Sequence, residues 1–107
     1  MADGRVLVIG GENAGNALAS GELFDPQAGT WTTLANSMSV PRTEATATLL
    51  ADGRVLVAGG RNTAYLNTAE IFNPANGQWA ATSETMTYAR CQATATRLRD
   101  GRVAVVG

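Results

Sequence analysis

Four charged residues of the types that form ion pairs recur at one fixed interval in this sequence. Arg42 returns as Arg90 and Glu22 returns as Glu70, each 48 positions later. A guanidinium can pair with a carboxylate or hydrogen-bond to carbonyl groups, so recurrence of both groups indicates bonding repeated in each structural unit. We expect Arg42 and Arg90 to find their carboxylates in Glu22 and Glu70. We assign them a structural role because ligand sites in repeat proteins usually lie where the repeats differ.

Side chains for acid–base, nucleophilic and metal chemistry are almost absent. The 107 residues contain no histidine and a single cysteine, Cys91. This composition excludes a histidine-based triad, a histidine zinc site, a cysteine metal cluster and an internal disulfide. We therefore predict no catalytic, cofactor-binding or metal-binding residue and no cofactor. Cys91 is expected to be a small buried side chain.

The charge balance argues against two further classes of partner. Eight arginines and no lysine are balanced by nine acidic residues, for a net charge of −1. The chain thus lacks the basic surface of a nucleic-acid binder or of a protein that binds anionic membranes. Apolar runs such as residues 6–9 are far too short to span a bilayer. Residues 1–4 have neither the basic nor the apolar region of a signal peptide, and the compartment stays open.

The whole sequence is repetitive, which identifies the elements that must position these side chains. The tetrad Asp-Gly-Arg-Val occurs three times, and other residues recur in the same register. The tetrads begin at Asp3, Asp52 and Asp100, and the paired positions include Phe24/Phe72, Pro26/Pro74, Trp31/Trp79, Met38/Met86 and, one residue further apart, Gly10-Gly11/Gly59-Gly60. Units of about 48 residues therefore build the chain.

One unit contains four runs with strand character. Two of them flank Asp52-Gly53, a strong signal for a tight hairpin, and residues 73–77 supply a second turn through Asn-Pro and Asn-Gly. No helical period longer than two turns occurs, so we expect an all-β fold. The expected strands are 5–9, 20–25, 30–34, 44–50, 54–58, 69–73, 78–82, 93–98 and 102–106. The expected core comprises Val6, Val8, Val55, Val57, Val103, Val105, Phe24, Phe72, Trp31 and Trp79.

The repeat resembles the kelch motif. The residues that carry the resemblance are Arg42, Asp52 to Gly60, Glu70 to Pro74, Trp79 and Met86. The sequence of the repeats is similar to that of kelch proteins related to the galactose oxidase propeller. The family often has histidine where this chain has Ala45 and Ala93. The Asp-box of sialidase-like propellers is a competing motif, but the spacing from Asp25 to Trp31 does not fit it.

The resemblance implies β-propeller blades of four antiparallel strands. Residues 1–41 then form a blade that lacks its first strand, 42–89 a complete blade, and 90–107 the first two strands of a third. A closed propeller needs at least four blades, so we expect an incomplete propeller and a chain that is part of a longer protein.

The recurrent glycines and tryptophans have structural interpretations. We expect Gly10, Gly11, Gly59 and Gly60 to allow close packing between blades or positive φ at a strand end. A phosphate cradle is disfavoured because no helix follows these glycines. Trp31 and Trp79 are expected to act as wedges between neighbouring blades, with sugar stacking as the alternative.

The positions that differ between repeats cluster in four longer connections, residues 12–21, 35–41, 61–68 and 83–89. In a four-stranded meander these connections lie at one end, opposite the tight turns. Their Asn, Arg and Tyr side chains suit recognition of a protein or carbohydrate. The candidate binding residues are Glu12, Asn13, Asn16, Arg61, Asn62, Tyr65, Asn67, Glu84 and Tyr88.

Three functions follow from this interpretation. The first, which we prefer, is a non-catalytic binding scaffold. The second is a portion of a galactose oxidase-like copper-radical oxidase whose catalytic residues lie elsewhere. Cys91 lies near Tyr88 in the sequence, and galactose oxidase uses a Cys–Tyr cross-link, but that site also needs histidine ligands. The third is a two-blade unit that self-assembles, so that further blades come from the longer chain or from other copies.

Overall fold

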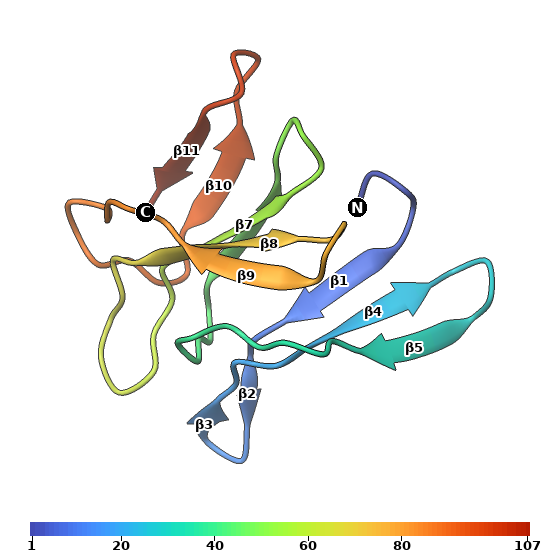
Figure 1. The fold of residues 1–107 in the computed structure, drawn as a ribbon. Coiled ribbons are helices and arrows are strands. Elements are labelled where there is room, and N and C mark those ends of the chain that lie inside the picture. The colour runs from blue at the N-terminus through green and yellow to red at the C-terminus, as the bar shows by residue number, and fades with distance from the viewer.

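The computed structural model describes residues 1–107 as an all-β chain of eleven strands without a helix. Of its four antiparallel sheets, three are the main ones, and they follow one another in chain order (Figure 1). The first sheet contains β1 (Val6–Ile9), β4 (Gly21–Asp25) and β5 (Thr30–Thr33); the central sheet contains β6 (Thr46–Leu49), β7 (Val55–Ala58), β8 (Ala69–Asn73) and β9 (Gln78–Ala81); the third sheet contains β10 (Thr94–Arg97) and β11 (Val103–Val106). No helix is present that could cross a membrane.

The expected strands are all present, and their ends differ from expectation by at most two residues. A small hairpin of β2 (Glu12–Asn13) and β3 (Asn16–Ala17) was not predicted. Its turn residues Ala14 and Gly15 both have positive φ, of 52° and 84°, as in the tight turns that suit twisted hairpins. The hairpin is too short and too polar to give a strand pattern in the sequence.

The Asp-Gly-Arg repeat has a local explanation. In the β6–β7 turn Gly53 has φ +90°, and the Arg54 guanidinium lies 2.7 Å from the Asp52 carboxylate, which also accepts the Arg54 backbone N–H. These hydrogen bonds lower the pKa of Asp52. The same Asp–Arg pair closes the turns at residues 3–5 and 100–102. Each tetrad therefore encodes a turn and its own ion pair.

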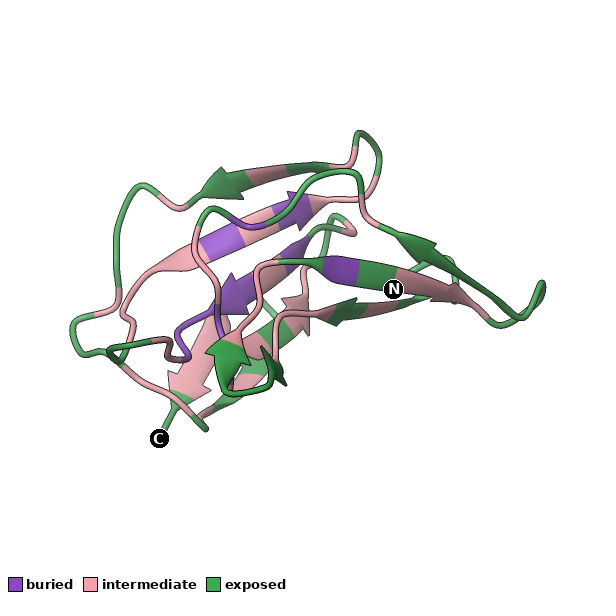
Figure 2. Cartoon of the chain, turned by 90° about the horizontal axis from the view of Figure 1, so that it is seen from below, coloured by how far each residue is buried: buried purple, intermediate pink, exposed green.

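The buried core lies between the first and central sheets. Val55, Val57 and Phe72 project from one face of the central sheet and enclose Met38, which comes from the connection between the two sheets. Leu7 and Ile9 of β1 pack against this cluster. Figure 2 shows the buried residues concentrated on the central sheet. One apolar face of the central sheet is therefore covered by the first sheet.

Part of the expected core is exposed. Val6, Val8 and Trp31 are 49%, 48% and 57% exposed, so their assignment to the core was wrong. They occupy the positions of Val55, Val57 and Trp79, but no sheet covers this face of the first sheet. Phe24, Trp79, Val103 and Val105 are partly buried. Burial of equivalent residues thus depends on whether a preceding sheet is present.

This difference gives a matched test of the core. Val57 is 1% exposed and Val8 48%. Val57→Ala should lower the free energy of unfolding by about 2 kcal/mol, because it removes buried methyl groups and leaves a cavity. Val8→Ala should change it by less than about 0.5 kcal/mol. Urea unfolding at low protein concentration measures both, and equal losses would contradict the arrangement of the sheets.

Candidate binding face

The guanidinium of Arg42 lies in the centre of the chain and is 1% exposed. It donates to the backbone oxygens of Gly59 and Thr68 at 3.0 and 2.7 Å and to the Thr68 hydroxyl at 3.0 Å. It also pairs with Glu70 at 3.3 Å, as expected from the repeat. Arg42 thereby holds the end of β7 and the beginning of β8 at a fixed distance from the connection that precedes β6.

The carboxylate of Glu70 has a second role. It accepts the backbone N–H groups of Ser39 and Val40 at 2.8 and 3.2 Å. Ser39 and Val40 belong to the connection between β5 and β6, so Glu70 fixes the path of the chain from the first sheet to the central one. The buried carboxylate of Glu70 thus has three hydrogen-bond partners, Arg42, Ser39 and Val40.

The backbone of Arg42 binds in the opposite direction, to the first sheet. Its carbonyl accepts the N–H of Gly11 at 2.8 Å, and its N–H donates to Leu18 at 3.0 Å. A Cβ on Gly10 would lie 2.5 Å from the same carbonyl, and Gly10 has φ +68°. Arg42 therefore connects two sheets, with its backbone on one and its side chain on the other.

Arg90 repeats only half of this arrangement. Its carbonyl accepts the Gly60 N–H at 2.7 Å, and its guanidinium donates to the Gly107 carbonyl at 2.9 Å. The expected pairing with Glu22 is absent, since Glu22 lies exposed on β4 and forms no ion pair. In the central sheet, Arg42 precedes the first strand, and its partner Glu70 lies 28 residues later on the third strand of the same sheet.

The longer connections emerge at one end of the sheets, and the tight turns at the other (Figure 1). We call the first end the loop face, made up of residues 10–20, 35–45, 59–68 and 83–93. Backbone bonds tie these connections together, with Thr43 bridged to Arg61 and Arg61 to Tyr65. Gln92 donates its backbone N–H to the Glu44 carbonyl at 2.9 Å. The loop face is therefore held by the backbone before any ligand binds.

A polar network lies on the loop face. The Arg61 guanidinium pairs with the Glu44 carboxylate at 2.7 Å, and the Gln92 side-chain amide donates to the same carboxylate at 3.1 Å. Glu44 and Gln92 have φ values of 58° and 52°, which is uncommon for residues other than glycine. Such conformations often mark functional positions. Glu44 and Gln92 occupy equivalent places, two residues after Arg42 and Arg90.

The electrostatics of the network follow from this pairing. The hydrogen bond from Arg61 lowers the pKa of Glu44, with a smaller contribution from Gln92. The carboxylate in turn raises the pKa of the Arg61 guanidinium. Cys91 is partly buried beside Glu44. Arg61 is therefore neutralised by Glu44 and is not the free cation that a site for acidic ligands would present.

The predicted binding residues fall into two groups. Most are exposed, with Tyr65 at 66% and Tyr88 at 70%; the other exposed members are Glu12, Asn13, Asn16 and Glu84. Asn62 is engaged within the chain, donating to Pro41 and accepting from Ala64. Asn67 is partly buried. Glu44 and Gln92 were not among the predicted residues, although they differ between the repeats and follow a recurrent arginine.

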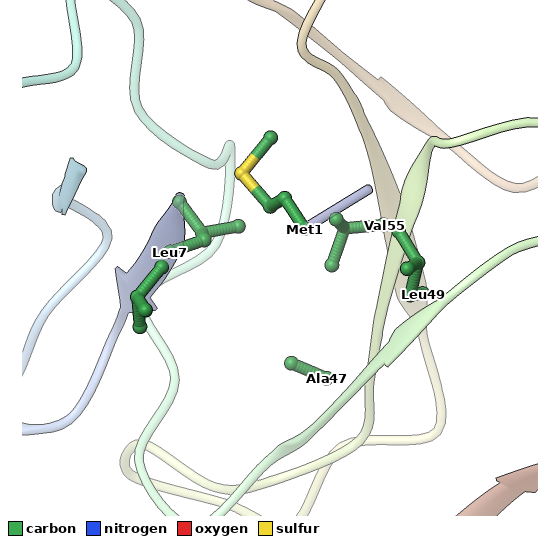
Figure 3. Close-up of a pocket in the computed structure, with 6 residues that line it drawn as sticks. Met1, Leu7, Ala47, Leu49 and Val55 are labelled. Atoms are coloured by element: carbon green, nitrogen blue, oxygen red, sulfur yellow. The ribbon is translucent and has the colours of Figure 1, made fainter. Parts of the chain in front are cut away.

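Two hollows lie between the first and central sheets. One, of about 130 Å³, is bordered by Gly11, Arg42, Glu44, Ala45 and Thr46 and by apolar residues beneath them. The Nε atom of Arg42 is buried without a hydrogen-bond partner. The other, of about 230 Å³, is lined by six hydrophobic residues and lies between β1 and β6 (Figure 3). Only the first combines a hollow with polar groups of the network.

Comparison with known proteins agrees with this architecture. The family model described as "Kelch motif" matches residues 2–38 and 44–84. The chain therefore belongs to the kelch family, which confirms the resemblance inferred from its sequence. None of the curated proteins compared with this chain matches it.

Solved structures extend the comparison to the fold. An alcohol oxidase described as "Novel fungal alcohol oxidase with catalytic diversity among the AA5 family, in complex with copper" superposes with a TM-score of 0.83 at 23% identity. The match covers 95% of this chain and 24% of that chain. At this identity the likeness shows a shared propeller-type fold. The present chain spans about a quarter of the length of the oxidase.

The buried ion pair can be compared with an exposed one. Glu70→Ala should lower the free energy of unfolding by about 3–5 kcal/mol, because it leaves the Arg42 charge buried without its counter-ion. Asp52→Ala removes an exposed partner of Arg54, and water screens that ion pair, so the loss should be far smaller. Chemical unfolding monitored by tryptophan fluorescence gives both values. Similar losses for the two variants would show that Arg42 is not the connection between the sheets.

The network also predicts a titration. Because Arg61 depresses the folded-state pKa of Glu44, the pair contributes stability above the ordinary glutamate pKa of about 4.3 and loses it as pH falls through the folded value. Arg61→Ala should therefore raise the pKa of Glu44, as followed by carboxyl NMR. Arg97→Ala, an exposed arginine elsewhere, is the control. An unchanged Glu44 titration in the Arg61 variant would contradict the pairing.

Proposed function

We propose that the chain forms part of a kelch propeller that acts as a non-catalytic binding scaffold, with the loop face as its recognition surface. The observation that supports this proposal is that recurrent residues and variable residues have different environments. The recurrent Arg42, Gly59, Gly60 and Glu70 are used in internal bonds. The residues that differ between repeats lie on the loop face, where Tyr65 and Tyr88 are exposed.

The loop face also has the rigidity that recognition favours. Arg61 is fixed by Glu44 through its side chain and by Thr43 and Tyr65 through its backbone. A surface that is ordered before binding loses less conformational entropy when a ligand arrives. Tyrosines on such a surface supply contact area with few rotatable bonds. This combination supports binding of a protein or carbohydrate ligand.

The charges favour a neutral ligand. Arg61, the cation nearest the exposed tyrosines, is neutralised by Glu44. The hollow beside Glu44 is bordered by that carboxylate, which suits a ligand with hydroxyl or amide groups. We therefore propose hydrogen bonding and stacking as the mode of recognition, with no strong preference for acidic peptides.

The alternative function is a portion of a copper-radical oxidase. Its support is the likeness in fold to the copper-containing alcohol oxidase. The residues of this chain do not fit a copper site, because histidine is absent and no three His, Cys, Asp or Glu side chains gather as ligands. Cys91 lies beside Glu44, which is engaged by Arg61 and Gln92. In this alternative the chain would be a structural part of the propeller.

A glycan and peptide array tests the proposed face. The full chain should bind neutral ligands, and Tyr65→Ala and Arg61→Ala should each weaken binding roughly tenfold or more, as expected for central contacts. Gln27→Ala, at an exposed turn on the opposite end, should leave binding unchanged. Binding that ignores the two loop variants, or that follows the negative charge of the ligand, would exclude the loop face as the site.

A further inference from the structure

The turn between β10 and β11 carries charges that the equivalent turns lack. All three Asp-Gly-Arg turns share one backbone, in which the glycine N–H donates to the carbonyl three residues earlier, at 3.1, 3.1 and 3.0 Å. Leu49 and Ala51 lie at the central turn, whereas Arg97 and Arg99 occupy the same positions 48 residues later. Two apolar side chains are therefore replaced by two guanidiniums on an unchanged backbone.

The aspartates of the central and third turns do not neutralise these two arginines. Each aspartate pairs with the arginine two residues later, at 2.7 Å in both turns, and the pairs are Asp52–Arg54 and Asp100–Arg102. Arg97 donates to the Leu49 carbonyl at 3.4 Å. Residues 50–54 and 97–102 together contain four arginines and two aspartates, so the two segments carry two excess positive charges.

A hollow of about 250 Å³ lies between the two turns, and we call it the turn hollow. Its lining residues are Ala51, Arg97, Leu98, Arg99 and Gly101. Leu98 is 39% exposed, which leaves apolar surface next to the two arginines. The hydrogen bond to the Leu49 carbonyl directs the Arg97 side chain toward the central sheet. The turn hollow thus combines two cationic groups with an apolar wall.

The turn hollow lies between two complete hairpins. β6 pairs with β7 and β10 pairs with β11, each over four positions. A hollow of about 150 Å³ occupies the corresponding place between the first and central turns and is lined by Ala2 and Gly53, the counterparts of two lining residues of the turn hollow. Residues 73–75 of the β8–β9 turn border that hollow as well. Such a hollow is therefore present where a sheet has all four strands, and the turn hollow differs from it in charge.

The chemistry of the turn hollow fits an oxyanion carried by a small molecule. Guanidiniums bind phosphate and similar groups through a planar fork of N–H donors, and two of them can hold separate oxygens of one group. The apolar wall suits the uncharged part of that molecule. Nucleic acids and anionic membranes need a broader basic surface, and the chain has a net charge of −1. A small ligand is therefore favoured over a polyanion.

We propose that the turn hollow is a binding site for a small phosphate or sulfate ester, with Arg97 and Arg99 on the oxyanion and Leu98 against the rest of the molecule. The site lies at the end of the sheets opposite the loop face (Figure 1). Both arginines stand where the central turn has apolar residues, and such differences between repeats mark positions available for recognition. The proposal does not depend on the ligand of the loop face.

Amide chemical shifts of the full chain during titration with phenyl phosphate test the site. The shifts should move at Ala51 and at residues 97–101, because both turns line the hollow. Inorganic phosphate, which lacks the apolar part, should move the same amides at higher concentration, and phenol should move none of them. Phenyl sulfate is titrated in parallel, and the tighter of the two esters identifies the oxyanion that the site prefers.

Single substitutions toward the central turn give matched variants. Arg97→Leu and Arg99→Ala introduce the residues that the same backbone already carries at positions 49 and 51. Each should weaken phenyl phosphate binding roughly tenfold, because charge-assisted hydrogen bonds are lost. Arg97→Lys should weaken it less, since lysine keeps the charge without the fork. Arg5→Ala removes the same charge from the first turn and should leave binding unchanged.

Two results would overturn the proposal. One is a shift pattern that spreads equally over the three Asp-Gly-Arg turns, or that is the same in the Arg97→Leu and Arg99→Ala variants as in the wild type, since either indicates nonspecific attraction of anions. The other is the absence of any response to phenyl phosphate, including the case in which double-stranded DNA, or vesicles of equal parts phosphatidylserine and phosphatidylcholine, do bind the chain.

Discussion

A buried guanidinium needs partners for its charge and its N–H groups, and the partners of the two terminal nitrogens of Arg42 organise the structure. Its side chain gathers Gly59, Thr68 and Glu70 on the central sheet, while its backbone binds Gly11 on the first. The approach is possible only because Gly10 has no Cβ. The spacing of two sheets and the path of the chain between them therefore depend on one residue, which explains why arginine and glycine recur together.

Because the recurrent residues make the internal bonds, the other residues of the repeat are available for recognition. Arg42 and Glu70 make buried bonds, and both residue types recur in the repeat, as Arg90 and Glu22. The connections on the loop face make their mutual contacts mainly through backbone atoms, so their side chains can differ. Arg61 and Glu44 belong to this variable set, and their pairing holds the strained backbone of Glu44 in place. A stable scaffold and a variable surface thus arise from the same 48-residue unit.

The repeat also explains why identical residues have different environments. Val57 and Val8 occupy equivalent strands, yet one is 1% exposed and the other 48%. A propeller blade buries one face against its predecessor and the other against its successor, so the end blades of any array keep one face free. β1 pairs with one strand only, and Trp31 is 57% exposed on the first sheet. Proteins commonly cover such edges, because unpaired strands invite association.

Local patterns in the sequence were sufficient to predict the strands, the turns and the kelch repeat. Alternation of apolar runs with Asp-Gly and Asn-Pro turns reflects interactions between near neighbours, which sequence displays directly. The Arg42–Glu70 pair was also predictable, since both residues recur. The pairing of Arg61 with Glu44, the exposure of Val8 and the isolation of Glu22 were decided by the tertiary structure. These depend on which sheets lie side by side, because burial and electrostatic pairing are set by distance in space and not by distance along the chain.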